Sequence, residues 1–107
     1  MNERVGVVHR FEHDDKGYIQ KVEFFGYGTY LGEELPPPGI MFMGFDMNKM
    51  GEETAKIQLD NGDIIWGCEC IFHSEEHIKR DIAGKEIIEV SINDLRGNSH
   101  YGTSAVG

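Results

Sequence analysis

The chain has 107 residues, the usual size of one domain, and 39% of them are apolar, including six Phe, four Tyr and one Trp. This composition is too hydrophobic for a disordered protein. Nineteen acidic residues against ten basic ones give a formal charge of −9, a sign that repels phosphate backbones and anionic lipid. We therefore expect no generic nucleic-acid binding and no membrane binding.

The first half of the chain predicts a hairpin followed by a bent strand. Polar and apolar residues alternate over 4–11, turn-forming residues occupy 13–17, and a second strand covers 18–25. Residues 26–32 interleave three glycines with two tyrosines, so the backbone can bend sharply there. The three prolines at 36–38 then predict an extended loop without backbone donors.

The segment 40–50 fits neither a helix nor a strand period, and it contains four of the five methionines together with Phe42 and Phe45. Two interpretations remain open. In the favoured one, the segment is a loop whose soft side chains close one end of the core. In the other, it is a deformable binding surface of the kind that methionine suits.

The second half predicts another hairpin, because Asn61 and Gly62 stand between the apolar runs 54–59 and 64–72. Alternation along 64–72 places one set of side chains in the core and sends Ile65 and Ile71 to the opposite face. The expected core set is Ile64, Trp66, Cys68, Cys70 and Phe72.

A short helix is predicted from Ser74, which caps it, to Gly84, which ends it, with Ile78 and Ile82 forming an apolar stripe. Residues 85–92 then form the last strand. We expect a single β-rich domain over 1–94 and a flexible C-terminal tail over 95–107. The fold class is mainly β: a small SH3-like antiparallel barrel, or a strongly bent sheet, with one short helix before the last strand.

Cys68, Cys70, His73 and His77 have metal-ligand chemistry and would allow a small zinc-binding domain. Their spacing is unlike that of zinc fingers, so the favoured interpretation is two buried thiols and two surface histidines, with no metal and no cofactor. Cysteines two residues apart are poorly placed for a disulfide and suit a reducing, cytoplasmic compartment. We expect no enzyme, because a nucleophilic cysteine must be exposed beside a base.

The glycine- and tyrosine-rich bend and the methionine-rich segment form the candidate binding surface. Exposed aromatics beside a flexible backbone hold peptides or stack on planar ligands, but the favoured interpretation of the two tyrosines is that they pack at a barrel corner. The candidate contact residues are Tyr27, Gly28, Tyr30, Glu33, Met43, Phe45 and Trp66. The expected partner is a host protein or a small nucleotide-like ligand. The alternative is a virion structural or assembly subunit that forms a homo-oligomer.

Three stretches together resemble a group of small uncharacterised proteins encoded by bacteriophages: GYGTYLGEELPP at 26–37, KIQLDNG at 56–62 and WGCEC at 66–70. The resemblance covers roughly residues 20–80 and carries no assigned activity. It implies a viral origin. Small acidic phage proteins of this kind are often inhibitors, so it also implies a counter-defence protein that sequesters or blocks a host factor in the host cytoplasm.

Overall fold

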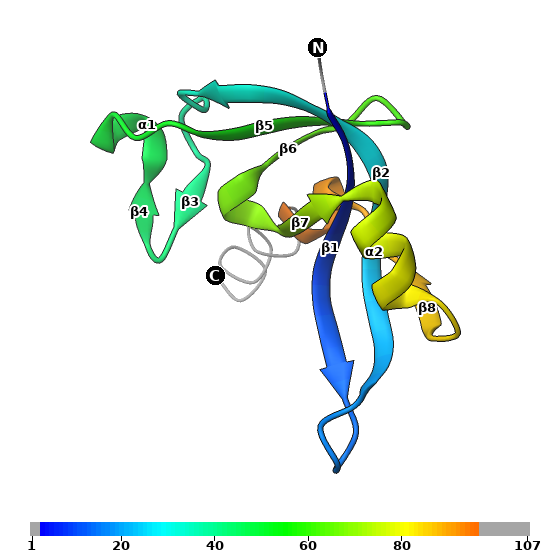
Figure 1. Ribbon diagram of the computed structural model, residues 1–107. Coiled ribbons are helices and arrows are strands. Elements are labelled where there is room, and N and C mark those ends of the chain that lie inside the picture. Colours follow the sequence, from blue (N-terminus) through cyan, green and yellow to red (C-terminus); the bar gives the residue numbers. More distant parts are fainter. Residues whose placement is uncertain (1–2, 97–107) are drawn as a thin grey trace.

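The computed structural model describes residues 3–96, and its spine is one long hairpin (Figure 1). Strand β1 (Glu3–His13) pairs antiparallel with β2 (Ile19–Glu34) through a turn at 14–18. In that turn the Asp14 carboxylate accepts hydrogen bonds from the backbone N–H groups of Lys16 and Tyr18, at 2.9 and 3.0 Å. The predicted first hairpin is confirmed. Strand β2 continues without a break through the glycine-rich segment 26–32, where it bends.

Three glycines let β2 bend without breaking. Gly26 and Gly32 have φ of 123° and 106°, and each lies beside a shift in strand register. Gly28 faces β5 (Thr54–Leu59), where a Cβ would lie 2.5 Å from the carbonyl oxygen of Gln58. The bend therefore depends on glycine for conformation at two positions and for close backbone approach at the third.

The second hairpin is also confirmed: β5 pairs antiparallel with β6 (Ile64–Trp66) across residues 60–63. Of the two expected turn residues only Gly62 has a positive φ, 98°, and its N–H donates to the Leu59 carbonyl at 2.9 Å. This pattern is a three-residue loop with a bulge and not the two-residue turn that Asn-Gly favours.

The predicted strand 64–72 is wrong, because it breaks after Trp66 into a 3-10 turn, η1 (Gly67–Glu69), and a separate strand, β7 (Ile71–Ser74). The Glu69 carboxylate accepts a hydrogen bond from the Trp66 N–H at 3.0 Å, replacing a strand partner. Gly67 lies so close to Ala55 that a Cβ there would be 2.9 Å from the alanine side chain. The expected alternation also fails within β6, because Ile65 is fully buried beside the buried Trp66.

Helix α2 (Glu75–Ile82) forms as predicted, with the Ser74 hydroxyl accepting from the His77 N–H and Gly84 following with a φ of 75°. The last strand in the described part of the chain, β8 (Glu86–Glu89), is shorter than expected and pairs parallel with β2. Residues 92–96 then form one helical turn. Leu95 and Arg96 are thus helical and not part of a tail, while 97–107 lie outside the described residues.

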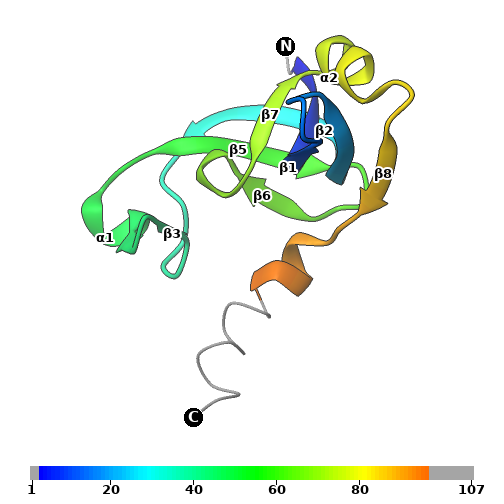
Figure 2. The same ribbon diagram turned by 90° about the horizontal axis from the view of Figure 1, so that it is seen from below.

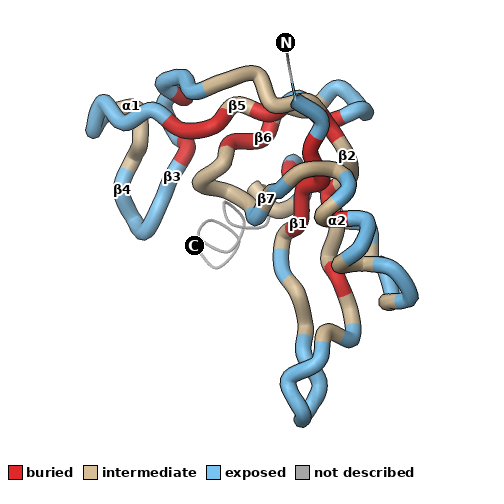
Figure 3. Tube along the Cα trace, viewed as in Figure 1, coloured by how far each residue is buried: buried red, intermediate tan, exposed pale blue. Residues whose placement is uncertain are grey.

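Both faces of the β1–β2 hairpin are covered near its middle, as the buried stretches show (Figure 3). On one face the core contains Val5, Val7, Phe25, Ile57, Leu59, Ile65 and Ile92. On the other face α2 lays Ile78 against Val8 and Val22. Gly6 admits the helix, because a Cβ there would lie 2.5 Å from the Cβ of Ile78.

The sheet has the strand order β6-β5-β2-β1-β7, with β8 paired to β2 beyond this path. Its outer strands β6 and β7 are joined by the short η1 turn, so the sheet folds strongly back on itself (Figure 2). Over residues 3–96 the path does not close into a barrel. The molecule is mainly β with a strongly bent, largely antiparallel sheet and one short helix before β8.

Salt bridges tie the N-terminal end of the hairpin to its neighbours. Arg4 makes two hydrogen bonds of 2.7 Å to the Asp60 carboxylate and one of 3.2 Å to Glu75. The bonds to Asp60 hold the pKa of that carboxyl below its ordinary value. No helix within residues 3–96 is both long enough and apolar enough to span a bilayer.

Candidate functional site

The methionine-rich segment folds into a small projection, here called the arm and defined as residues 35–53. It consists of the two-residue strands β3 (Met41–Phe42) and β4 (Phe45–Asp46), which pair with each other, and one turn of helix, α1 (Met47–Met50). The arm stands apart from the main sheet, at the far side from α2 (Figure 1). Its apolar residues therefore lie outside the two core clusters.

Polar contacts fix the base of the arm. The Asp46 carboxylate caps α1 by accepting from the N–H groups of Asn48 and Lys49, at 2.9 and 3.3 Å, and it also accepts from Gly39 at 3.0 Å. The bond from Gly39 is the main reason that the pKa of Asp46 is lowered. The Asn48 side chain donates to the Pro36 carbonyl at 2.8 Å. The arm therefore has a defined shape.

The tip of the arm is a strained turn. Met43 has a φ of 52° and Gly44 a φ of 85°, two consecutive positive values of the kind found in type I′ turns. Asn, Asp or Gly normally occupies the first of these positions, and a long side chain there costs free energy. Met43 is nevertheless present with 81% of its surface exposed. An exposed apolar side chain at a strained backbone position makes Met43 a candidate functional residue.

A backbone hydrogen bond closes the β3–β4 hairpin at its base: the Met47 N–H donates to the Ile40 carbonyl at 2.9 Å. Ile40 itself is buried, whereas the residues after it face outward. Large exposed fractions are found for Met41, Phe42, Met43, Phe45 and Met50. The favoured interpretation of 40–50, side chains that close the core, is therefore wrong. The geometry is that of the alternative, an exposed deformable surface.

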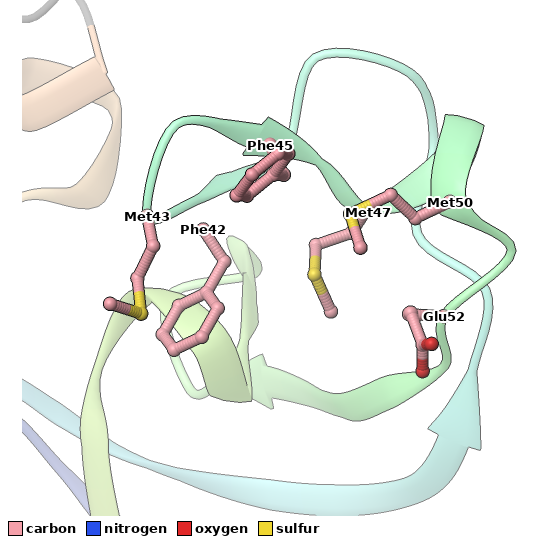
Figure 4. A pocket seen from close by; sticks show the side chains of 6 residues that line it. All are labelled: Phe42, Met43, Phe45, Met47, Met50 and Glu52. Carbon is pink, nitrogen blue, oxygen red and sulfur yellow. The ribbon is translucent and has the colours of Figure 1, made fainter.

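The exposed side chains surround a hollow of about 420 Å³ (Figure 4). Phe42 and Phe45 enter it from the hairpin, Met47 and Met50 from α1, and Glu52 supplies a carboxylate at its edge. The hollow is thus apolar with one acidic margin. Apolar concavities of this kind are typical of sites that bind a protein segment or an apolar ligand, so the hollow is the candidate site.

A second hollow of about 500 Å³ lies where the arm meets the sheet, against Pro36, Lys56, Trp66 and Arg96. Trp66 contributes little open surface, because it is 5% exposed, and the Lys56 ammonium lies 6.0 Å from its ring. Arg96 donates to both carboxylate oxygens of Glu69 and to the Ile64 carbonyl. The charged groups beside this hollow are thus engaged within the protein. Fewer of them are available to a ligand than the exposed side chains around the hollow on the arm.

The two tyrosines of the glycine-rich bend do not share a site. Tyr27 packs on the α2 side of the sheet, edge-on to Phe24 at 5.0 Å and with the Lys79 ammonium 5.6 Å from its ring. Tyr30 packs on the opposite face, stacked on Phe72 at 6.2 Å. Both tyrosines are thus partly buried against neighbouring side chains of the sheet, as the favoured interpretation expected.

The remaining predicted contact residues are divided between the arm and the sheet. The Glu33 carboxylate accepts a hydrogen bond from the Tyr30 hydroxyl at 2.6 Å, which raises the pKa of that tyrosine. Gly28 allows β2 and β5 to approach closely, because a Cβ there would clash with the Gln58 carbonyl. Of the predicted contact residues, Met43 and Phe45 are the two that line the hollow on the arm. The hollow is completed by three further residues of the methionine-rich segment and by one residue outside it, Glu52: the three are Phe42, Met47 and Met50.

The cysteines and histidines do not converge. Cys70 packs against the first core cluster and donates to the Trp66 carbonyl at 3.5 Å, and burial raises its pKa to about 12. Cys68 lies in η1, and partial burial raises its thiol pKa too. His73 and His77 stack on each other at 3.8 Å. Within residues 3–96, no three His, Cys, Asp or Glu side chains are grouped so as to hold a metal ion.

These thiols lack the properties of a catalytic nucleophile. A cysteine nucleophile needs a lowered pKa and an adjacent base, whereas both thiols have raised pKa values and stay protonated at neutral pH. The His77 ring is instead 3.1 Å from the Asp81 carboxylate, one helical turn further along α2. The arm is therefore a stronger candidate site than the two thiols.

Comparison with known proteins found no family model, no curated protein sequence and no solved structure that matches the chain.

Proposed function

We propose that this chain is a small acidic binding module without catalytic chemistry, and that it captures a protein partner on the apolar surface of the arm. The observation that carries the proposal is the exposure of the arm's apolar side chains, 81% for Met43 and 59% for Phe45. Contiguous exposed apolar residues around a hollow are typical of interaction sites. Aromatic and methionine side chains are also enriched at protein interfaces.

The anchoring of the arm supports the same proposal. Its backbone is fixed by the Asp46 cap and by the bond from Asn48 to Pro36, so binding does not first have to order the chain. Its methionine side chains, in contrast, rotate freely and adapt to the shape of a partner. A rigid frame with soft contacts suits capture of a protein surface.

A nucleotide-like ligand receives less support. Base stacking needs a free aromatic face, but Tyr27 and Tyr30 pack within the fold. Phosphate binding needs available cations, but Arg4, Arg10 and Arg96 form ion pairs with carboxylates. The resemblance to phage proteins extends the proposal: the captured partner is a host protein, and its capture serves counter-defence.

A virion assembly subunit is the second candidate, because an exposed apolar arm also clasps neighbouring copies in oligomers. Light scattering after size-exclusion chromatography separates the two. A large ring or filament that the arm variant Phe42→Ala/Phe45→Ala dissolves would favour assembly. A monomer or dimer favours capture.

The direct test is affinity capture from bacterial lysate with the native chain, the variant Phe42→Ala/Phe45→Ala and the control Tyr18→Ala/Ile87→Ala. The control removes apolar surface of similar exposure far from the arm, since Tyr18 and Ile87 are 68% and 40% exposed. We expect at least one protein to be retained by the native chain and the control but not by the arm variant. A panel of nucleotides that raises the melting temperature, with no arm-dependent protein, would contradict the proposal.

A further inference from the structure

We infer that the segment which docks on the arm is a basic amphipathic helix of a partner protein. This inference rests on the proposed function and specifies its partner. Three features of the arm carry it: the size of its strands, the charges beside its hollow and the softness of its lining.

The strands of the arm are too short for a partner strand. β3 and β4 have two residues each, and their pairing joins only Met41 to Asp46 and Phe42 to Phe45. Strand addition draws its affinity from a row of main-chain hydrogen bonds, which a two-residue edge cannot supply. A hollow lined by side chains instead receives apolar anchors, and a helix presents these at positions i, i+3, i+4 and i+7.

The charges beside the hollow select a basic partner. Residues 33–53 contain five carboxylates and a single basic residue, Lys49. Glu52 borders the hollow, and strand register places Glu34 opposite Thr54, next to Glu53. Four exposed carboxylates lie where the arm leaves the sheet: Glu33, Glu34, Glu52 and Glu53. Glu34 forms an ion pair with Lys56 at 3.5 Å and Glu33 accepts from the Tyr30 hydroxyl, so the charge offered to a partner comes mainly from Glu52 and Glu53. Complementary charge brings Lys and Arg side chains to this margin.

The same charges disfavour a second copy of this chain as the occupant. Two copies would bring these margins together with an overall charge of −9 on each molecule. Like charges across an interface cost free energy, and the cost grows at low ionic strength. A basic partner converts this repulsion into attraction and faster association.

The lining matches a helix whose apolar face is irregular. Met47 lies at the centre of the hollow, with Phe42 and Phe45 toward one end and Met50 toward the other (Figure 4). Unbranched thioether side chains change rotamer at little cost and fill gaps between branched anchors. The aromatic rings supply fixed contact area beside them. This combination allows helices of different sequence to bind, provided that they carry the same pattern of basic charge.

The test uses a fluorescein-labelled peptide of about 18 residues, a length that permits helix formation, with Leu on one helical face and Lys flanking it. Two control peptides keep its length: one has the same residues in scrambled order, and one has Glu in place of Lys. Fluorescence anisotropy gives the Kd for each peptide with the full chain. Helix formation on binding is followed by circular dichroism.

We expect the Leu/Lys peptide to bind at least about tenfold more tightly than either control peptide, with a Kd that weakens as salt is raised. The variant Phe42→Ala/Phe45→Ala should lose about tenfold or more in affinity, and so should Glu52→Lys/Glu53→Lys. The matched controls are Tyr18→Ala/Ile87→Ala and Glu86→Lys/Glu89→Lys, which make the same kinds of change on exposed residues away from the arm. These should leave the Kd within about twofold.

Other outcomes overturn the inference in distinguishable ways. If the scrambled peptide binds equally, or if Glu52→Lys/Glu53→Lys has no effect, the partner is not a basic helix, although the arm remains a docking surface. Self-association that Phe42→Ala/Phe45→Ala abolishes, without peptide binding, assigns the arm to a second copy. Peptide binding that the arm variants leave unchanged removes both the inference and the proposed function.

Discussion

The docking of α2 on the sheet depends on one close contact, between Gly6 and Ile78, and this contact can be tested by a double-mutant cycle. A Cβ added to Gly6 would lie 2.5, 2.6 and 2.8 Å from three atoms of the Ile78 side chain. The nearest of these is the Cβ of Ile78, which is attached directly to the helix backbone. Relief of the clash therefore requires α2 to move as a unit.

The magnitudes follow from packing. Gly6→Ala overfills the contact and should destabilise the fold by about 1–3 kcal/mol. Ile78 is 1% exposed, so Ile78→Ala leaves a cavity and should cost about 2–5 kcal/mol. In the double variant the clashes with the two Cγ atoms of Ile78, at 2.6 and 2.8 Å, are absent, and only the contact with the Cβ of residue 78 remains. The double variant should thus be more stable than the sum of the single changes, by about 1 kcal/mol or more.

Urea denaturation measures these values, with the fluorescence of Trp66 as the signal because it is the single tryptophan and is buried. Circular dichroism at the same urea concentrations checks that unfolding is two-state. If the two single changes add to within about 0.5 kcal/mol in the double variant, the residues are not in contact. In that case the docking of α2 described above would be incorrect.

Three further predictions concern the arm, the thiols and acid stability. Met43→Asn should raise the melting temperature, because asparagine tolerates a positive φ. It should also weaken partner binding, because it removes an exposed apolar side chain. A lowered melting temperature would contradict the strained turn. Iodoacetamide at mildly alkaline pH should modify Cys68 before Cys70, whose pKa is about 12, as peptide mass spectrometry can show; equal rates would contradict its burial. Arg4 lowers the pKa of Asp60, so the stability that this pair contributes is lost as the pH falls through that pKa. Arg4→Gln removes the pair and should therefore reduce the loss of stability on acidification. If the melting temperatures of the variant and the native chain fall in parallel from neutral to acid pH, this prediction is refuted.

The parts of the fold that local residues determine were predictable. Helix α2 carries its own signals, with Ser74 at its start, Ile78 on its apolar side and Gly84 after its end. The two long hairpins likewise have turn-forming residues between alternating strands. Each of these features is decided by residues close in sequence, so a pattern over about ten positions is enough.

The parts that distant residues determine were not predictable. At the strand break after Trp66, Glu69 accepts a hydrogen bond from a residue only three positions away, but its carboxylate is oriented by Arg96, 27 residues further along the chain. The parallel pairing of β8 with β2 likewise has no local signal, because the apolar alternation of 85–92 fits either direction. Residues 92–96 become helical although Ile92 was expected to continue the strand.

The candidate site was predicted in part. The methionine density of 40–50 drew attention to the segment that lines the hollow, but it did not show which side chains would share that hollow. Tyr27 and Tyr30 were grouped by their closeness in sequence, whereas their side chains belong to opposite faces of β2. The tip turn was missed, because Met43 is an unfavourable residue at a positive φ and gives no turn signal.

The hydrogen bond between Met47 and Ile40 closes a short loop, and within it residues 41–45 lie outside the capping network that Asp46 forms. Substitutions at 41–45 alter the face offered to a partner, while the buried Ile40 and the Asp46 cap keep the point of attachment constant. Recognition and anchoring thus depend on different side chains of the same loop. In an engineering setting, the same junction is the natural place to graft new recognition sequences.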